Sequence, residues 1–228
     1  MSKFIPIDMP RSKSFGCNYY ETYSLKLKRN VRLYSELEYK NFLTLEMDSK
    51  ITEFCEQPIK INIEIDGKSE STVFDMWVHY SNGIEEMQEV KYTTDLDPFN
   101  ELSKKTRMQI QKQELWCKTY GYNYNIRTEK VIERGTYYIN NLRYLYGLVK
   151  RSDNPLIRNY IKILQNKISL NKVMIKDIIN EKELLNENLF SIIALGIYEG
   201  KIEADINSKI ICYDTELWNF NTSSKNAE

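Results

Sequence analysis

The sequence predicts an α/β (α+β) protein in which a small mixed sheet is flanked by helices, followed by a smaller, mostly helical domain. Apolar residues recur at helical spacing over residues 34–47 and 98–120. Between these segments lie three short runs rich in β-branched and aromatic residues, separated by Asp-Gly and Asn-Gly turn signals. A further strand-like run follows the second helix, and this order of elements is typical of a mixed sheet.

The first predicted helix covers residues 34–47, where Leu37 and Leu45 share one face. Ser35 stands just before it and Glu38 follows three residues later, which is the S-x-x-E pattern of a capping box. Taken by itself, Glu38 is therefore interpreted as a helix cap.

Three strands are predicted next. Residues 59–65 (IKINIEI) alternate apolar and polar side chains as a half-buried strand does, and an Asp-Gly turn follows. Residues 72–80 (TVFDMWVHY) are rich in β-branched and aromatic residues, and after an Asn-Gly turn residues 87–92 (MQEVKY) are predicted as the third strand. Two hairpin turns therefore link the three strands.

The long helix over residues 98–120 ends at Gly121, and a strand is predicted over residues 124–131. Beyond about residue 134 the pattern becomes helical. The candidate helices there are residues 137–149, 156–164, 172–180 and 182–198. Short strands at 201–206 and 209–214, joined at Asn207-Ser208, would close a small winged-helix-like C-terminal domain.

The composition excludes several classes of protein. The 228 residues are 42% hydrophobic and 28% charged, as in ordinary globular proteins. The four cysteines are scattered singly, and His79 does not complete a zinc site with them, so neither a zinc protein nor a disulfide scaffold is expected. No apolar run reaches the roughly 20 residues of a membrane helix, and the N-terminus lacks a signal-peptide core. We therefore expect a cytoplasmic location and no membrane partner.

The net charge is zero, but it is unevenly distributed. Residues 1–32 hold seven Lys or Arg against Asp8 and Glu21, whereas residues 150–228 hold 11 basic and 11 acidic residues. The basic arm suits a nucleic-acid phosphate backbone, although a solvated tail has the same composition. The neutral C-terminal part lacks the basic excess of a DNA-reading domain, so protein contact is at least as good an interpretation there.

Three charged residues lie within the second and third predicted strands. Asp75 stands in the middle of an apolar strand, where a carboxylate is costly to desolvate unless it is compensated. Because side chains alternate along a strand, Glu89 and Lys91 point to one face, and pairing through the Asn-Gly turn brings Asp75 within reach of it. One spot is thereby predicted to hold two carboxylates and an ammonium group.

Neighbouring carboxylates repel each other and take up protons unless a cation intervenes. Ligation by oxygen alone suits Mg²⁺, or Mn²⁺ as a substitute, with water and phosphate oxygens completing the shell. The metal would lower the pKa of a bound water, and Lys91 would orient that water or stabilise the developing charge. Glu38, reaching in from the first helix, would be the third carboxylate, so the predicted metal ligands are Glu38, Asp75 and Glu89.

An Asp followed by E-x-K is a weak signal alone, since a cross-strand salt bridge on a solvated sheet has the same residues. The context is more specific, because a helix with Glu38, strands with Asp75, Glu89 and Lys91, a long helix and a further strand follow in the order of the PD-(D/E)xK nuclease core. This order resembles a restriction-endonuclease-like fold. The resemblance implies a metal-dependent DNA endonuclease with these four residues as its catalytic set.

A closer resemblance is carried by residues 35–58 (SELEYKNFLTLEMDSKITEFCEQP) together with the STVFDMWVHY and MQEVKY segments. The S-x-L-E-x-x-x-F-L-x-L-E block, followed by Glu-Gln-Pro, resembles the TnsA endonucleases of heteromeric cut-and-paste transposition systems. By that resemblance the helix carboxylate is Glu38 rather than Glu36 or Glu46, and Gln57 is structural. The best-known TnsA has Gln in place of Glu89, and this departure should strengthen metal binding.

The TnsA resemblance implies a substrate and two partners. The substrate would be the double-stranded DNA of transposon ends, cut at the 5′ ends while a TnsB-type transposase handles the 3′ ends. A TnsC-type AAA+ ATPase would contact the C-terminal domain, and the chain would act in the bacterial cytoplasm, at the nucleoid. The predicted domains are a basic arm at residues 1–32, the PD-(D/E)xK catalytic domain at residues 33–134 and the winged-helix-like domain at residues 135–228.

Two other functions stay open. A stand-alone restriction-type or junction-resolving nuclease would use the same four residues without partners. A non-catalytic adaptor would use a nuclease-like sheet only to bridge DNA and an ATPase, and the presence of all four site residues argues against it.

Overall fold

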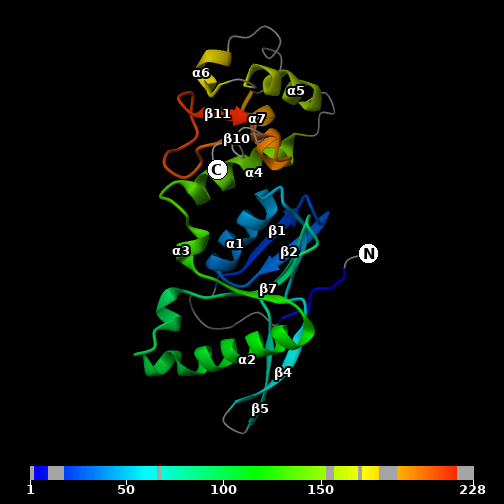
Figure 1. The fold of residues 1–228 in the computed structure, drawn as a ribbon, viewed down its shortest axis with the longest axis vertical. Helices are drawn as coiled ribbons and strands as arrows, with labels where there is room; N and C mark the ends of the chain where they lie inside the picture. The colour runs from blue at the N-terminus through cyan, green and yellow to red at the C-terminus, as the bar shows by residue number, and fades with distance from the viewer. Residues whose placement is uncertain are drawn as a thin grey trace. The chain divides into compact units, whose positions relative to one another are not determined.

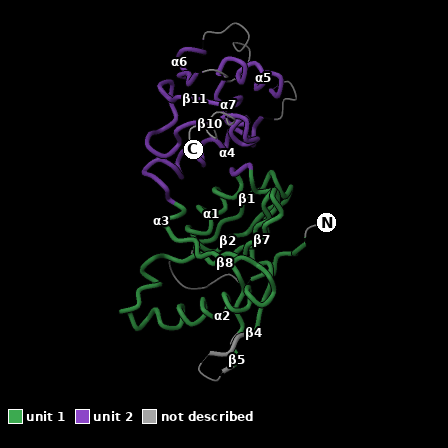
Figure 2. The backbone as a smooth tube through the Cα atoms, in the orientation of Figure 1, with its two compact units in different colours: residues 1–46, 50–132 green, residues 47–49, 133–228 purple. Residues whose placement is uncertain are grey.

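The computed structural model describes residues 3–9, 18–65, 68–152, 157–168, 171–179 and 189–219. The chain forms two compact units (Figure 2). The first unit contains residues 1–46 and 50–132, and the second contains residues 47–49 and 133–228.

A four-stranded sheet lies at the centre of the first unit (Figure 1). Its strands, in spatial order, are β3 (Ile51–Glu56), β6 (Met76–Tyr80), β7 (Glu85–Val90) and β8 (Asn123–Arg127). The pairs β3/β6 and β6/β7 are antiparallel, whereas β7/β8 is parallel, so the sheet is mixed. The flanking helices are α1 (Glu36–Met47) and α2 (Lys104–Tyr120). The predicted mixed sheet flanked by helices is confirmed.

Alternation along β7 directs its side chains to the two helices. Gln88 accepts a hydrogen bond from Asn41 of α1 (2.9 Å), while Glu89 accepts one from Gln113 of α2 (3.0 Å). Neighbouring residues of a strand point to opposite faces. The two helices therefore cover opposite faces of the sheet.

The strand predicted over residues 72–80 is wrong as a single element. The structure divides it into β5 (Lys68–Val73), which pairs with β4 (Lys60–Ile65), and β6, which pairs with β3 and β7. The division falls at Asp75, where the backbone oxygen accepts a hydrogen bond from the amide of Gln57 (3.1 Å). The strand β3 was not predicted at all, and the predicted Asp66-Gly67 turn lies outside the described residues.

A hairpin that the sequence analysis did not predict precedes α1. It consists of β1 (Tyr20–Ser24) and β2 (Arg29–Leu33), which pair antiparallel. The buried carboxylate of Glu46 accepts hydrogen bonds from Ser24 Oγ (2.6 Å) and from the amides of Leu25 (2.9 Å) and Lys26 (3.1 Å). The second half of the expected basic arm is therefore folded onto the first unit.

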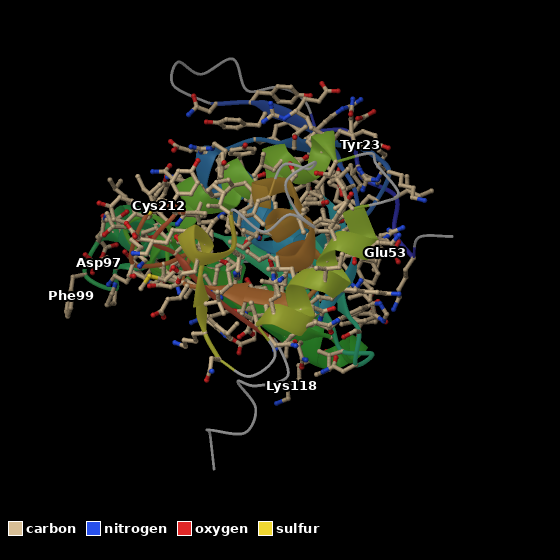
Figure 3. All side chains as sticks on the ribbon, turned by 90° about the horizontal axis from the view of Figure 1, so that it is seen from above. Tyr23, Glu53, Asp97, Phe99, Lys118 and Cys212 are labelled. Carbon is tan, nitrogen blue, oxygen red and sulfur yellow. The ribbon has the colours of Figure 1, made fainter. Side chains whose placement is uncertain are left out.

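The segments around α2 also differ in detail from the prediction. A short 3-10 helix, η1 (Thr93–Leu96), precedes the predicted start of the long helix at residue 98, and a second, η2 (Glu101–Ser103), replaces its predicted first turn. Phe99 lies between them and is 95% exposed (Figure 3). The helix α2 ends at Gly121 in the left-handed conformation (φ 77°), as predicted. The strand β8 ends at Arg127, and α3 (Glu129–Ile132) replaces the predicted end of that strand.

The second unit combines helices with a small sheet. Its helices are α4 (Tyr138–Arg151), α5 (Ile157–Lys167), α6 (Ile175–Ile178) and α7 (Leu189–Tyr198), and its strands are β9 (Val173–Met174), β10 (Ile202–Ala204) and β11 (Glu216–Asn219). The sheet has the order β10-β11-β9. The part of the predicted 182–198 helix before residue 189 lies outside the described residues.

Two predictions about the second unit are wrong. Residues 209–214 form no strand, because Asn141 holds this stretch as a loop by donating to the Ile206 and Lys209 carbonyls (2.8 and 2.7 Å) and accepting from the Ile211 amide (3.0 Å). The strand that pairs with β10 is β11 instead. The helix predicted over residues 172–180 begins as β9, which pairs with β11. The winged-helix interpretation of this unit stays a prediction. No helix in the described part of the chain is long and apolar enough to cross a membrane.

Candidate active site

Asp75, Glu89 and Lys91 meet at the end of β7. The ammonium nitrogen of Lys91 lies 2.8 Å from Glu89 Oε1 and 4.0 Å from Asp75 Oδ2. Asp75 Oδ2 also accepts a hydrogen bond from the Val90 amide (2.7 Å), which ties the bend before β6 to the end of β7. The structure thus brings together the three residues that the strand pattern predicted to share one spot.

Glu38 approaches the same place from the first turn of α1. Its Oε2 accepts a hydrogen bond from the Tyr34 amide (3.0 Å) and its own amide donates to Ser35 Oγ (3.1 Å). The capping interpretation is therefore correct in part, since the carboxylate satisfies a backbone amide just before the helix. The same carboxylate is 9% exposed and lies close enough to Asp75 for the two charges to interact. Glu38 is both a cap and a neighbour of the acidic site.

The other two glutamates of α1 lie elsewhere. Glu36 forms a surface ion pair with Lys40, one turn along the helix (3.0 Å). Glu46 accepts hydrogen bonds from the turn of the β1–β2 hairpin, as described above. Of the three candidates in this helix, Glu38 is the one whose carboxylate faces Asp75.

Burial and mutual repulsion raise the pKa values of the three carboxyl groups. Burial, followed by the charge of Asp75, raises the pKa of Glu38 to about 7 and that of Glu89 to about 7. Burial also raises the pKa of Asp75, against the opposing effects of Lys91 and the Val90 amide. For Lys91, burial lowers the pKa, but the nearby carboxylates of Asp75 and Glu89 outweigh it and hold the pKa above its ordinary value. The site therefore has one firmly charged ammonium and three carboxyl groups with a raised affinity for protons.

Two glutamines of α2 hold Glu89 in place. Gln109 Nε2 donates to Glu89 Oε1 (3.0 Å) and Gln113 Nε2 donates to Glu89 Oε2 (3.0 Å). Both amides also contact Thr72 Oγ1, and the Tyr124 hydroxyl donates to Gln113 Oε1 (2.8 Å). Glu89 is 1% exposed and Gln113 fully buried, so these bonds fix the orientation of the carboxylate.

Sequence reasoning missed this glutamine pair. The available signal was two amides four residues apart within a predicted amphipathic helix, which places both on one face. Because a buried amide needs hydrogen-bond partners, Gln109 and Gln113 on the inner face of that helix would have indicated a buried polar group opposite them.

Gln57 connects Glu38 with Asp75. Its amide donates to the Asp75 carbonyl (3.1 Å), and its side-chain amide lies 3.5 Å from Glu38 Oε2. Its φ of 40° is in the left-handed region, which a residue with a side chain adopts at a cost of about 1–3 kcal/mol. The residue was expected to shape the chain before the next strand, and it also contacts the site directly.

The oxygen donors of the site are compatible with a divalent metal ion that is coordinated partly by the protein and partly by water. Among the described residues, no group of three or more His, Cys, Asp or Glu side chains is placed to hold a metal ion. Mg²⁺ commonly binds proteins through one or two carboxylates and keeps several waters. Asp75 and Glu89, whose carboxylates lie 4.0 and 2.8 Å from the same Lys91 nitrogen, supply such a pair. The chemistry of the donors therefore fits a hydrated divalent cation.

Residues 48–129 match the family described as TnsA-like endonuclease N terminal. The matched segment includes Asp75, Glu89 and Lys91, together with both glutamines of α2, and begins after Glu38. No curated protein matches the chain.

Proposed function

We propose, from the premise that residues 48–129 form a TnsA-like endonuclease domain, that this protein is a metal-dependent DNA endonuclease. It would cleave phosphodiester bonds at the 5′ ends of a transposon, as the TnsA subunit of a heteromeric transposase. The observation that carries the proposal is the meeting of Asp75, Glu89 and Lys91 within the matched segment, with Lys91 Nζ 2.8 Å from Glu89 and 4.0 Å from Asp75.

Each residue has a distinct role in this proposal. Asp75 and Glu89 would hold Mg²⁺, for which Mn²⁺ could substitute, and Glu38 would bind a second ion directly or through water. When bound, the metal would supply Lewis-acid polarisation of the phosphate and a more acidic water. Lys91, held charged by its acidic neighbours, would orient the attacking water and stabilise negative charge that develops on the phosphate oxygens. Gln109 and Gln113 would keep Glu89 in its ligating orientation.

The raised pKa values support a cation at this place. Without one, Glu38 and Glu89 favour their neutral forms up to about pH 7, because burial and Asp75 oppose their charges. A divalent cation would relieve both effects at once. Binding of a metal would therefore stabilise the charged forms of these carboxyl groups, which are unfavourable in the metal-free protein.

The proposed partners follow from the family. The substrate would be double-stranded DNA at transposon ends, with a TnsB-type transposase acting at the 3′ ends. A TnsC-type AAA+ ATPase would contact the second unit, whose charge is balanced from residue 150 onward, with 11 basic and 11 acidic residues. A surface without a basic excess suits protein contact better than DNA contact. The winged-helix-like interpretation of this unit and a site of action at the bacterial nucleoid belong to the same proposal.

The test is cleavage of end-labelled transposon-end DNA in Mg²⁺ or Mn²⁺, with and without the neighbouring transposase and ATPase. Asp75→Asn keeps an oxygen for the Val90 amide but removes the charge, so we expect cleavage to fall by about 10³-fold or more while the fold is kept. Asp95→Asn, an exposed aspartate on η1, is the matched control and should cut like the wild type.

The outcomes separate the proposal from its alternatives. Cutting at 5′ ends that requires the partners supports the TnsA role. Cutting by the isolated wild type, lost in Asp75→Asn, indicates a stand-alone nuclease that uses the same site. Equal cutting by Asp75→Asn and wild type contradicts the site assignment, and absence of cutting in every combination favours the non-catalytic adaptor.

A further inference from the structure

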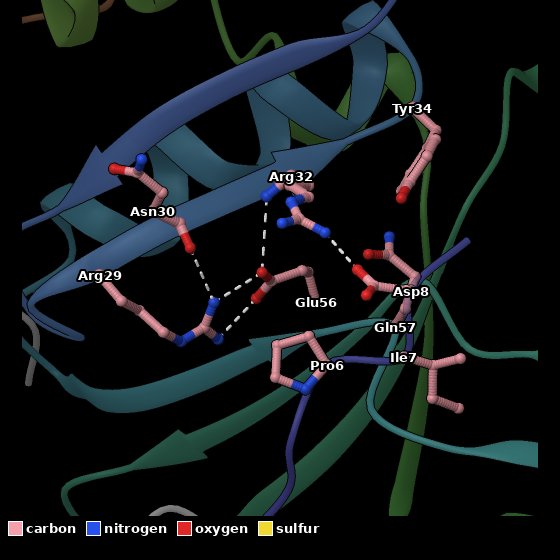
Figure 4. Close-up of a pocket in the computed structure, with 9 residues that line it drawn as sticks. All are labelled: Pro6, Ile7, Asp8, Arg29, Asn30, Arg32, Tyr34, Glu56 and Gln57. Carbon is pink, nitrogen blue, oxygen red and sulfur yellow. Dashed lines mark hydrogen bonds and ion pairs between the residues drawn. The ribbon is translucent and has the colours of Figure 1, made fainter. Parts of the chain in front are cut away.

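A pocket of about 220 Å³ lies in the first unit (Figure 4). Three segments line it: the N-terminal segment with Asp8, the strand β2 with Arg29 and Arg32, and the end of β3 with Glu56 and Gln57. Two guanidinium groups and two carboxylates therefore face one small space. The catalytic proposal assigns no role to this pocket.

The pocket and the acidic site share a wall. Tyr34 and Gln57 line the pocket, and both contact Glu38 Oε2, through the Tyr34 amide (3.0 Å) and the Gln57 side-chain amide (3.5 Å). A ligand in the pocket would thus lie next to the residues that position Glu38.

The two arginines of the pocket are held very differently. Arg29 forms a two-pronged ion pair with Glu56, with 2.6 Å between each pair of atoms, and the side chain of Glu56 is 3% exposed. Bidentate pairs of this kind fix the guanidinium group in one orientation. Glu56 also accepts a bond from the Arg32 amide (3.4 Å). Arg29 is therefore part of the framework and is not available to a ligand.

Arg32 instead pairs with Asp8, and both side chains are exposed. The exposed fractions are 49% for Arg32 and 87% for Asp8. An ion pair between exposed groups contributes little stability, because water and salt screen it. Asp8 is held on both sides by its neighbours, since the Ile7 amide donates to the Gln57 carbonyl (3.0 Å) and the Tyr34 hydroxyl donates to the Met9 carbonyl (3.0 Å). Its carboxylate can therefore turn away from Arg32 while the segment stays in place.

We propose that Arg32 in this pocket binds a backbone phosphate of the DNA substrate. Asp8 pairs with the Arg32 guanidinium group until the phosphate displaces the Asp8 carboxylate. The inference rests on the proposed function, because it takes DNA as the ligand. While Asp8 is paired, the four charged groups sum to zero, and its departure leaves Arg29 and Arg32 against Glu56, a net charge of +1. The planar fork of an arginine matches phosphate oxygens in the same two-pronged way as it matches a carboxylate.

This inference also sorts the seven cations of residues 1–32. Lys3 pairs with Glu85, Lys26 donates to the Ile51 carbonyl and Arg29 pairs with Glu56, so each is engaged with the protein. Lys28 lies in the turn between β1 and β2 and does not line the pocket, and Arg11 and Lys13 lie outside the described residues. The phosphate contact that the sequence predicted for a whole basic arm is thereby assigned to Arg32.

The test measures binding of a labelled DNA duplex in EDTA, so that it does not depend on cleavage, over 50 to 200 mM salt. Arg32→Ala keeps the backbone amide bond to Glu56 and is expected to weaken binding by about 3- to 10-fold and to reduce the slope of log K against log salt by about 1. Asp8→Asn removes the competing carboxylate and is expected to tighten binding. The double variant should behave like Arg32→Ala alone, since Asp8 acts through Arg32.

Lys3→Ala is the matched control, because it removes one positive charge from another ion pair of the same segment without touching the pocket. It should change the salt slope by much less than Arg32→Ala, and thermal melting should show all variants folded. Equal slopes for Lys3→Ala and Arg32→Ala overturn the proposal, as does weaker binding by Asp8→Asn or no DNA binding by the wild type. Inorganic phosphate alone is the second probe, and its effect on thermal melting is measured. If phosphate stabilises the wild type but not Arg32→Ala, while both proteins bind DNA equally well, the ligand is free phosphate and the DNA proposal fails.

The two proposals can fail separately. Metal-dependent cleavage that is lost in Asp75→Asn, together with unchanged DNA binding by Arg32→Ala, leaves the nuclease intact and removes only the phosphate pocket. DNA binding that depends on Arg32, together with no cleavage under any condition, supports the phosphate pocket and contradicts the nuclease proposal.

Discussion

The two units of the molecule differ in what they bury. Among the residues that the structure describes, the buried charged side chains all belong to the first unit: Glu38, Glu46, Glu56, Glu89 and Arg127. The buried polar side chains of the second unit are the neutral Asn141 and Thr215, set in an aliphatic core. Because burying a charge opposes folding unless partners compensate it, the first unit gives up stability that the second unit keeps. This difference indicates that the chemistry lies in the first unit.

A second contrast lies within the first unit. Glu46 and Glu56 are buried but fully engaged, the first by three donors of the β1–β2 turn and the second by Arg29. Glu38 and Glu89 are also buried, and burial, followed by the like charge of Asp75, raises their pKa values. The first pair builds the framework, while the second pair shares its surroundings with a third carboxyl group.

The largest effect is expected for Lys91→Met. The substitution keeps the length of the side chain but removes the ammonium group next to Glu89 and Asp75, so cleavage should fall by about 10³-fold. Single-turnover cleavage of labelled DNA in Mn²⁺ measures it. Lys118→Met, on the exposed side of α2, should retain full activity. Retention of activity by Lys91→Met would place the chemistry elsewhere.

For Glu46→Ala we expect a loss of stability of about 3 kcal/mol. Ser24 and the amides of Leu25 and Lys26 would lose their acceptor, and buried donors without partners are costly. Urea unfolding followed by circular dichroism measures the free energy of unfolding. A loss below about 1 kcal/mol would show that Glu46 is not part of the framework.

Gln113→Ala should act on metal binding more than on folding. Removing the donor to Glu89 Oε2 frees the carboxylate to rotate, and loss of such a supporting contact typically weakens metal affinity by about 10- to 100-fold. Calorimetric titration of the variant with Mn²⁺, without DNA, gives the affinity. Gln111→Ala, an exposed neighbour on the same helix, should bind the metal like the wild type. Equal affinities in the two variants would remove Gln113 from this role.

The last effect is a dependence of stability on pH in the metal-free protein. The pKa of Glu38 and of Glu89 is raised to about 7 in the folded state, so between the unfolded value of 4.5 and pH 7 the folded protein binds more protons than the unfolded chain. The free energy of unfolding should therefore fall as pH rises through this window, by roughly 1 kcal/mol per unit for each of the two groups. Denaturant melts in EDTA measure it, and Mn²⁺ should cancel the fall at pH 8. A rise in stability over the same window would contradict the raised pKa values.

Features that depend on neighbours along the chain could be predicted from the amino-acid sequence. Helical spacing and the S-x-x-E cap located α1 and placed Glu38 at its start, because both signals act within a few residues. Strand alternation predicted that Glu89 and Lys91 share one face, and the structure places them in contact. The mixed sheet was predicted from such local patterns, whereas the match to a TnsA-like endonuclease domain was predicted from the resemblance of residues 35–58 and two strand segments to that family.

How distant segments meet could not be predicted from the sequence. Asp75 lies at a bend where the chain leaves β5, which pairs with β4, and enters β6, which pairs with β3, and there the Gln57 amide donates to the Asp75 carbonyl. Gln109 and Gln113 donate hydrogen bonds to Glu89. Arg29 is held by the buried Glu56, whereas Arg32 pairs with the exposed carboxylate of Asp8. Hydrogen bonds between residues 18 to 27 positions apart leave no periodic trace in a sequence. Local propensity specifies each helix and strand, whereas the burial of a side chain and its hydrogen-bond partners are determined only when the elements pack together.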